Sequence, residues 1–222
     1  MKTIKMILAA VAFFGTVNIL PAQNINWRGL HAEQIHLINL NVGWDYGSTI
    51  GIGYGYKLKT AIPIVLNVDF SLPFGSRLLD DFKVKVGGQA ELLRRGNFSA
   101  TVKAYGIFRR YQNVLARLLN FGSEFSGVCG YFQPAWYAAA EFGFDKAITT
   151  HIKNSARMRE DFPEVRDGWY IPTGGNFFYG IQAGYSFERY DVYLKFGKTV
   201  TQDLKTTALI PFYLQLGLNS KF

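Results

Sequence analysis

The sequence predicts an all-β fold, a closed antiparallel transmembrane β-barrel of about ten strands preceded by a signal peptide. Three observations predict it. Apolar and polar residues alternate with a period of two along most of the chain. The alternating segments reach the ~9–11 residues of a tilted membrane strand, whereas strands of globular proteins usually have ~5–6. The apolar face is rich in aromatic residues, which membrane barrels place near the headgroups.

The composition of the 222-residue chain agrees with this class. Charged residues make up 18%, against roughly 25% in an average soluble domain, and aromatic residues make up 16%. The single cysteine excludes a disulfide scaffold, and the hydrophobic content of 49% argues against a disordered chain or a coiled coil.

The first residues have the features of a signal peptide. Lys2 and Lys5 form a basic region, residues 6–17 form an apolar core too short to span a membrane, and Ala22 offers a small residue for cleavage. We therefore expect a signal peptide at 1–22 and one barrel domain at 23–222. No cysteine follows the apolar core, so we expect no lipoprotein anchor, and no later apolar run is long enough for a transmembrane helix.

Alternation is clearest in three segments, 50–58, 82–92 and 177–187. In the first, the even positions are Ile, Ile, Tyr, Tyr and Leu, and glycine or lysine occupies most of the odd positions. Successive side chains of a strand point to opposite faces, so each segment has one apolar face and one polar or small face. A soluble β-sandwich with its apolar face inside is the alternative. The glycines and mixed charges of the polar face favour a barrel lumen instead.

Ten segments satisfy the pattern, and an even number agrees with exported bacterial barrels. Eight strands remain the alternative if the 127–154 region is misassigned. This assignment leaves long connections at 73–81, 110–126 and 155–175, which we place on the external side. We expect Pro63 and Pro134 at strand ends or bulges, because proline lacks the amide donor of a ladder. The predicted strands are 34–45, 48–59, 61–72, 82–94, 97–109, 127–142, 146–154, 176–188, 190–200 and 207–222.

The last predicted strand carries a family resemblance. Phe212, Leu214, Leu216 and Leu218 alternate on one face, and the chain ends in Phe222. This strand resembles the C-terminal assembly signal of small outer-membrane β-barrel proteins of Gram-negative bacteria. The resemblance implies insertion by the barrel-assembly machinery and location in the cell outer membrane. It implies no substrate.

Charged residues at polar-face positions form the candidate functional site. We interpret them as a network of ion pairs filling a narrow lumen, because buried charges need partners. A conducting path for small solutes, favouring anions through a basic excess, is the alternative. The predicted lumen charges are Lys57, Lys59, Asp69, Lys83, Lys85, Glu91, Lys103, Arg109, Glu141, Glu188, Asp191 and Lys195, together with Lys221.

Candidates for catalysis are few. Asp80 and Asp81 could combine with His151 as in outer-membrane proteases, and Ser155 with His151 as in lipases, which keeps an outer-membrane hydrolase as a further alternative. His31 and His36 lack metal-ligand spacing, so we expect neither a metal nor a cofactor. We interpret Cys129 as a small packed residue.

The connections offer candidate contact surfaces. Leu115, Leu118 and Leu119 would share one face of a helix within 110–126, and we predict a lid or partner contact there. Basic residues of the 155–175 connection could meet lipopolysaccharide phosphates: Arg157, Arg159 and Arg166.

The sequence therefore predicts a non-enzymatic outer-membrane barrel that is structural or an accessory subunit of an envelope complex. A narrow, porin-like channel is the first alternative. Its expected partners are outer-membrane lipid, the assembly machinery and an envelope protein, and we expect no nucleic-acid binding.

Overall fold

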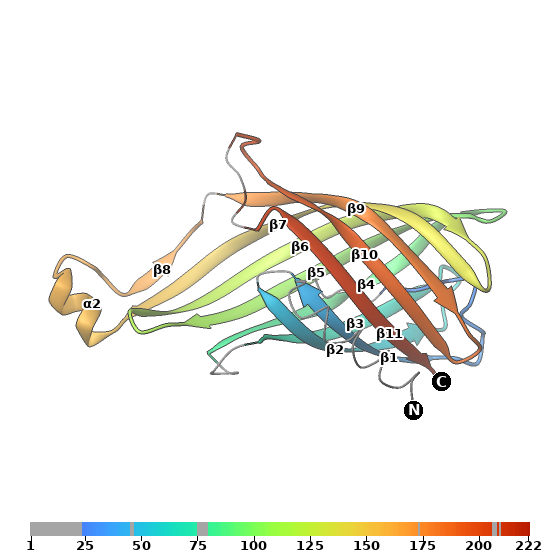
Figure 1. Ribbon diagram of the computed structural model, residues 1–222, viewed down its shortest axis with the longest axis horizontal. Helices are drawn as coiled ribbons and strands as arrows, with labels where there is room; N and C mark the ends of the chain where they lie inside the picture. Colours follow the sequence, from blue (N-terminus) through green and yellow to red (C-terminus); the bar gives the residue numbers. More distant parts are fainter. Residues whose placement is uncertain (1–23, 45–46, 75–79, 173, 206–207, 209) are drawn as a thin grey trace, which may run out of the picture.

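A computed structural model shows that the chain folds into a closed antiparallel β-barrel of ten strands (Figure 1). The structure describes residues 24–44, 47–74, 80–172, 174–205, 208 and 210–222. The predicted signal peptide, 1–22, lies outside the described residues. Within that part of the chain, no helix is both long and apolar enough to cross a membrane.

The ten barrel strands follow the chain as a meander in which neighbours in sequence pair in space. An eleventh strand, β8 (Gly168–Tyr170), adds to the edge of β7 outside the ring. The barrel strands are β1 (His36–Trp44), β2 (Ser48–Leu58), β3 (Ile64–Pro73), β4 (Asp81–Arg95), β5 (Phe98–Gln112), β6 (Ala116–Phe132), β7 (Trp136–Asn154), β9 (Gly175–Ser186), β10 (Tyr190–Thr201) and β11 (Phe212–Lys221).

Pairing of the first and last strands closes the ring. β1 runs antiparallel to β11 from Leu37 opposite Lys221 to Trp44 opposite Leu214. On the other side, β7 pairs with both β6 and β9. Every barrel strand therefore has two neighbours, so backbone amides and carbonyls are satisfied within the sheet and no long edge remains.

The predicted all-β, closed antiparallel barrel and its count of ten strands are confirmed, but two strand assignments are wrong. The predicted strand 127–142 runs across the β6–β7 turn, and the predicted turn at 143–146 lies inside β7. The predicted connection 110–126 is mostly the end of β5 and the start of β6. The predicted count is still ten, because the prediction divided β7 between two strands and gave β6 no strand of its own.

The prolines lie where a sheet tolerates them. Pro63 directly precedes β3, and Pro134 lies in the three-residue turn between β6 and β7. Both positions confirm the expectation that these prolines occupy strand ends.

Both described ends of the chain lie at one end of the barrel, which we call the proximal end; the opposite one is the distal end (Figure 1). The proximal turns are short, at 59–63, 96–97, 133–135 and 187–189. The distal connections include the longest, at 155–174. The distal β5–β6 turn, 113–115, is short where a long connection was predicted.

One side of the wall is much taller than the other. β4 to β7 contain 15 to 19 residues each, whereas the remaining barrel strands contain 9 to 12. The distal parts of β5, β6 and β7, together with α2 (Ala156–Asp161) and β8, project beyond the ring (Figure 1). We call this projection the arm.

The arm corrects the prediction of a helical partner loop. Leu118 and Leu119 are consecutive strand residues of β6, so their side chains point to opposite faces. Leu115 belongs to the short turn before that strand. Helical spacing matched these leucines by coincidence, since the helix they would share does not form.

Candidate functional site: the barrel interior and the arm

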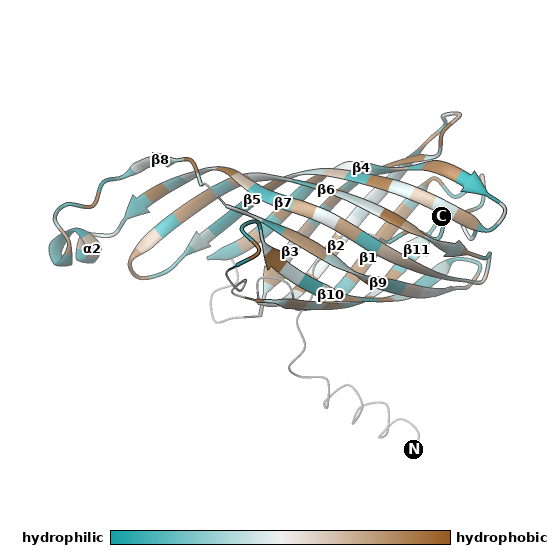
Figure 2. Cartoon of the chain, turned by 90° about the horizontal axis from the view of Figure 1, so that it is seen from above, coloured by the Kyte–Doolittle hydropathy of each residue, from teal (hydrophilic) through white to brown (hydrophobic). Residues whose placement is uncertain are grey.

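Hydrophilic and hydrophobic residues alternate along the strands (Figure 2). Their burial places the polar side chains inside the ring and the large apolar side chains outside it. Large apolar residues such as Ile52, Val86 and Leu194 are about half exposed on the outer face. Among the described residues, ten inward charged side chains are at most 9% exposed, five basic and five acidic: Lys83, Lys85, Lys103, Lys195, Lys221, Asp69, Glu91, Glu124, Glu141 and Asp191.

The centre of the interior is a charge cluster around Glu141 of β7. Its carboxylate forms ion pairs with Lys195 of β10 and with Lys103 of β5, the latter at 3.2 Å. Nearby, Lys85 of β4 lies 2.5 Å from Glu124 of β6. Each of these pairs joins strands two positions apart in the ring, so the charges of these pairs have counterions, which offset their desolvation.

The proximal opening is filled by the chain itself, because residues 24–29 enter the barrel before β1. Asn24 Oδ1 accepts a hydrogen bond from Lys103 Nζ, and its carbonyl accepts one from Asn219. Trp27 Nε1 donates to Thr101 of β5 at 2.9 Å, and the indole packs in an apolar cluster with Ile25 and Leu37.

The amide of Asn26 completes this proximal plug. Its Nδ2 donates to the carbonyl of Gln133 and to Ser186 Oγ, which lie in the β6–β7 turn and at the end of β9. Lys221 Nζ donates to the carbonyl of Gly29 and pairs with Asp191 at 2.8 Å. Contacts from several strands therefore hold 24–29 across the proximal opening.

Inward aromatic rings face glycines on the neighbouring strand. A Cβ on Gly217 would lie 2.2 Å from Tyr193 Cζ, so the ring occupies the space that a side chain would need. Tyr193 OH accepts hydrogen bonds from Asn39 and Gln215, which fixes the ring within the interior. The same cross-strand pairing recurs in Tyr105–Gly87, Tyr137–Gly184, Phe178–Gly143 and Tyr213–Gly197.

Asp69 differs from the other inward carboxylates. It lies opposite Lys85 in the β3–β4 register, yet both of its oxygens are buried without a hydrogen-bond donor among the described residues. The Lys85 ammonium contacts Glu124 instead.

Most predicted lumen charges lie inside, with two corrections. Lys59 and Glu188 are exposed in proximal turns, one residue or more beyond the ends of their strands, so they do not belong to the lumen. Lys57 lies at the proximal rim and donates to the carbonyl of His31. Arg109 pairs with Asp81 at the distal rim, at 2.8 Å.

Sequence reasoning missed Glu124 and the inward tyrosines. Glu124 fell in the predicted connection 110–126, although residues 124–131 alternate in the sequence as strand residues do. The inward tyrosines were not singled out from the sequence, because a phenol suits both lipid interfaces and polar interiors. A glycine directly opposite a tyrosine would indicate that the ring points inward, but such a pair can be recognised only when the strand register is known.

The arm ends in a small distal site. The Asp167 carboxylate accepts hydrogen bonds from the backbone and side-chain amides of Asn154, and Arg159 donates to it at 2.7 Å. The backbone amide of Asn154 is the main reason that the pKa of Asp167 lies below its ordinary value, and Arg159 adds to the effect. These contacts fix the loop after α2 to the end of β7.

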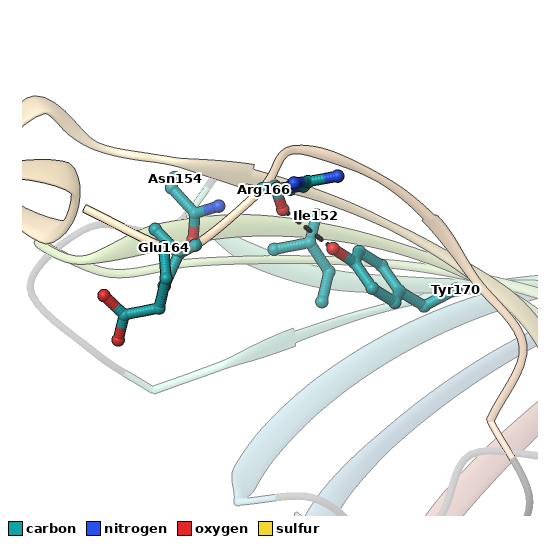
Figure 3. Close-up of a pocket in the computed structure, with 6 residues that line it drawn as sticks. Ile152, Asn154, Glu164, Arg166 and Tyr170 are labelled. Atoms are coloured by element: carbon teal, nitrogen blue, oxygen red, sulfur yellow. Dashed lines mark hydrogen bonds between the residues drawn. The ribbon is translucent and has the colours of Figure 1, made fainter. Parts of the chain in front are cut away.

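Beside this site is an open pocket of about 390 Å³ (Figure 3). Tyr170 OH donates to the carbonyl of Arg166 at 2.8 Å and forms one wall. The charged groups of Glu164 and Arg166 lie apart (Figure 3). The pocket lining contains no arrangement of nucleophile and base: Ile152, Asn154, Glu164, Val165, Arg166 and Tyr170.

The candidate catalytic residues do not come together. Asp81 points inward to Arg109, while His151 packs on the outer face against Trp169 at 4.9 Å between ring centroids. Their strands are three apart, or roughly 14 Å at ~4.8 Å per strand. Ser155 Oγ caps α2 by accepting from the amide of Met158. Asp80 accepts a backbone hydrogen bond from Gln112.

Other singled-out residues lie on the outer face or near an end. His36 Nδ1 is 2.7 Å from Tyr54 OH, and its ring stacks with that of Phe222. Cys129 is exposed on the outer face, which corrects its interpretation as a packed residue. The alternating set of the last strand also points outward: Phe212, Leu214, Leu216, Leu218 and the terminal Phe222. In the described part of the chain, no group of three potential ligands could hold a metal.

Comparisons with known proteins add no family. No protein-family model matches the chain, and no curated protein matches it.

Proposed function

We propose that this chain is a non-enzymatic barrel of a bacterial outer membrane, sealed along its axis, that holds the arm at a fixed place on the distal surface. It serves as a structural protein or as an accessory subunit of an envelope complex. The single observation that carries the proposal is the outer face, which is apolar between two rings of aromatic side chains.

The proximal aromatic ring includes close contacts between neighbouring strands. Phe98 and Tyr131 lie 5.3 Å apart, and Tyr131 and Trp136 lie 5.6 Å apart, measured between ring centroids. Its outward members are His36, Tyr54, Tyr56, Phe98, Tyr131, Trp136, Tyr185, Phe187, Tyr190 and Phe222.

The distal aromatic ring crosses the tall wall in an unbroken series. Phe82 and Phe108 are 5.8 Å apart, and Phe108 and Phe121 are 5.0 Å apart. The outward members are Phe70, Phe82, Phe108, Phe121, Phe144, Trp169 and Phe177.

The separation of the two rings fits a bilayer. On β5, Phe98 and Phe108 mark the two rings, and ten residues at ~3.4 Å each span ~34 Å along the strand. With a strand tilt of about 40°, that length corresponds to ~26 Å along the barrel axis, close to the ~25 Å apolar band of outer-membrane barrels. The outward residues between them on β5 are Ala100, Val102, Ala104 and Gly106.

Charges on the outer face lie close to the aromatic rings or beyond them, and none lies midway between the two rings. Along the described barrel strands, the outward charged residues are Arg95 at the proximal end and, at the distal end, Arg110, Arg117, Lys146, Lys153 and Lys198. A charge at mid-membrane would cost ~2–4 kcal/mol. Their placement therefore supports a lipid-facing outer surface.

The interior supports a sealed barrel. The inward charges listed above are nearly inaccessible to water, and residues 24–29 occupy the proximal opening. The five buried bases match the five buried acids, so the buried set offers no basic excess to select anions. This balance favours the structural role over the anion channel.

Export and assembly complete the proposal. The predicted signal peptide at 1–22 would direct the chain out of the cytoplasm, and the outward alternation of β11 would present the assembly signal. The scattered positions of Asp81, His151 and Ser155 support a role without catalysis.

Two measurements test the proposal. Cell fractionation should find the processed chain in the outer membrane, extracted only by detergent, and recovery of folded protein in a detergent-free soluble fraction would refute membrane insertion. In planar bilayers the purified protein should give no discrete conductance steps. Regular steps that reverse selectivity on Lys83→Glu would instead establish the channel.

A further inference from the structure

We propose that the outer face of the arm binds phosphomonoester groups of membrane lipids through Arg110 of β5, Arg117 of β6 and Lys153 of β7. We call these three residues the basic cluster. This inference rests on the proposed membrane location, because it places the cluster at the level of the distal headgroups.

The strand registers bring the three side chains to one face. Arg117 lies directly opposite Lys153 in the β6–β7 ladder and opposite Gln112 in the β5–β6 ladder. Arg110 lies two residues before Gln112 on the same face and donates to its side chain at 2.8 Å. Directly opposed residues have Cβ atoms ~4.5–5.5 Å apart, so Arg117 and Lys153 are adjacent like charges.

The basic cluster has no acidic partner. No ion pair joins Arg110, Arg117 or Lys153 to a carboxylate within the described residues, and Nε of both arginines is buried without an acceptor. Like charges directly opposed across a ladder are destabilising. An anion between them would remove that repulsion.

Two other arginines of the arm are paired, whereas Arg166 forms no ion pair among the described residues. Arg157 forms an ion pair with Asp161, and Arg159 forms one with Asp167. Arg109, which precedes Arg110 but points inward, binds Asp81 through two nitrogens. Adjacent cations without a counterion are therefore found on this outward surface, while the paired arginines lie elsewhere in the arm.

The position of the basic cluster identifies the source of the anion. Arg110 lies two strand positions beyond Phe108 of the distal aromatic ring, and Arg117, opposite Lys153, lies four beyond Phe121, all on the same face. Aromatic rings lie at headgroup depth in membrane barrels. Positions two to four residues beyond this ring, toward the tip of the arm, are then at the level of the lipid phosphates.

The charge of the basic cluster favours a phosphomonoester. Three cations on one face match a group that carries close to two negative charges better than a phosphodiester, which carries one. Arginine also binds phosphate oxygens through two parallel N–H donors. We therefore assign a lipid with a terminal phosphate as the ligand.

The test uses the full chain reconstituted in phosphatidylcholine nanodiscs that contain phosphatidate, a phosphomonoester lipid, at a tenth of the lipid. After detergent exchange, we expect the amount of phosphatidate that remains bound to the wild type to be at least ten-fold greater than the amount of phosphatidylglycerol retained from nanodiscs that contain that lipid instead. The variant R110Q/R117Q/K153Q should lose this enrichment. The control R95Q/R157Q/K205Q removes the same number of charges outside the basic cluster and should retain it.

The outcomes separate the two proposals. Equal phosphatidate retention by wild type and R110Q/R117Q/K153Q would overturn the inference, as would displacement of phosphatidate by millimolar inorganic phosphate, which would indicate a site for the free ion. Equal loss in R95Q/R157Q/K205Q would show unspecific charge attraction and would also overturn it. Failure of wild type to insert into nanodiscs would refute the membrane location instead.

Discussion

The inner and outer faces of the same strands handle charge in opposite ways. Inside, Glu141 lies between Lys103 and Lys195, and acids and bases are equal in number among the buried residues. Outside, the charges of the described strands are all basic and lie close to the aromatic rings or beyond them. The inner charges stabilise the barrel through one another, whereas the outer charges need a partner from the surroundings. The inward charged residues therefore stabilise the fold, whereas the outward basic residues are candidates for binding an anion.

The largest expected effect comes from breaking the inner balance. Glu141→Gln keeps the shape but leaves Lys103 and Lys195 buried without their shared counterion. Removing one partner of a buried ion pair typically costs ~3–5 kcal/mol. Urea unfolding in lipid vesicles should show a loss of that size, and Glu160→Gln, an exposed change in α2, should show almost none. A loss below ~1 kcal/mol would mean that the Glu141 cluster stabilises little.

Placing a charge on the outer face tests its environment. Val102→Arg puts a guanidinium at the middle of the outward band of β5. If this band faces lipid, the unfolding free energy in vesicles should fall by ~2–4 kcal/mol. Val114→Arg, in the exposed distal turn, is the matched control and should fall within ~0.5 kcal/mol of wild type. Equal effects of the two changes would contradict a lipid-facing band.

A glycine substitution on each face sharpens the contrast in packing. Gly217→Ala places a Cβ against the Tyr193 ring, and overpacking of this kind costs ~1–3 kcal/mol. Gly127→Ala, on the outer face, meets no atom within 4 Å. The same unfolding assay should rank the two variants in that order, and the opposite order would show that the inward rings are free to move.

The smallest effect concerns the pH dependence of the arm. Because the pKa of Asp167 lies below its ordinary value of 3.8, its contacts with Asn154 stabilise the folded arm above that pH. They are lost as the pH falls through the lowered pKa. Protection of the 154–170 amides, relative to their intrinsic exchange rates, should fall in acid, and Asp167→Asn should lower it already at pH 7. Unchanged exchange in that variant would exclude this anchoring role.

The sequence alone predicts the faces of most strands because a two-residue period survives in any barrel. The 82–92 segment alternates cleanly, and β4 places the predicted residues inside. Alternation fails where both faces meet water or where a bulge shifts it. In the arm, Leu118 and Leu119 are adjacent apolar residues, and a register shift follows Phe121, so strand β6 was mistaken for a connection.

The turn between β6 and β7, which the sequence analysis missed, could have been predicted from Pro134. A proline in the middle of a predicted membrane strand conflicts with the ladder, and a turn at that residue gives the observed β6 and β7. The ion-pair partners of the inward charged residues could not be predicted from the sequence alone. Lys85 meets Glu124 across two strand intervals, and only the registers of β4, β5 and β6 bring these residues to one level.

Tryptophan quenching tests most directly whether the outer face contacts lipid and the interior is sealed. The chain has four tryptophans, of which Trp136 points outward and Trp27 lies inside the proximal plug. Two variants, each retaining one of these and carrying phenylalanine at the other three positions, would be reconstituted with brominated lipids. We expect bromine to quench Trp136 strongly and Trp27 weakly, with Trp27 shielded from aqueous acrylamide. Quenching of Trp136 by acrylamide but not by brominated lipid would contradict this account.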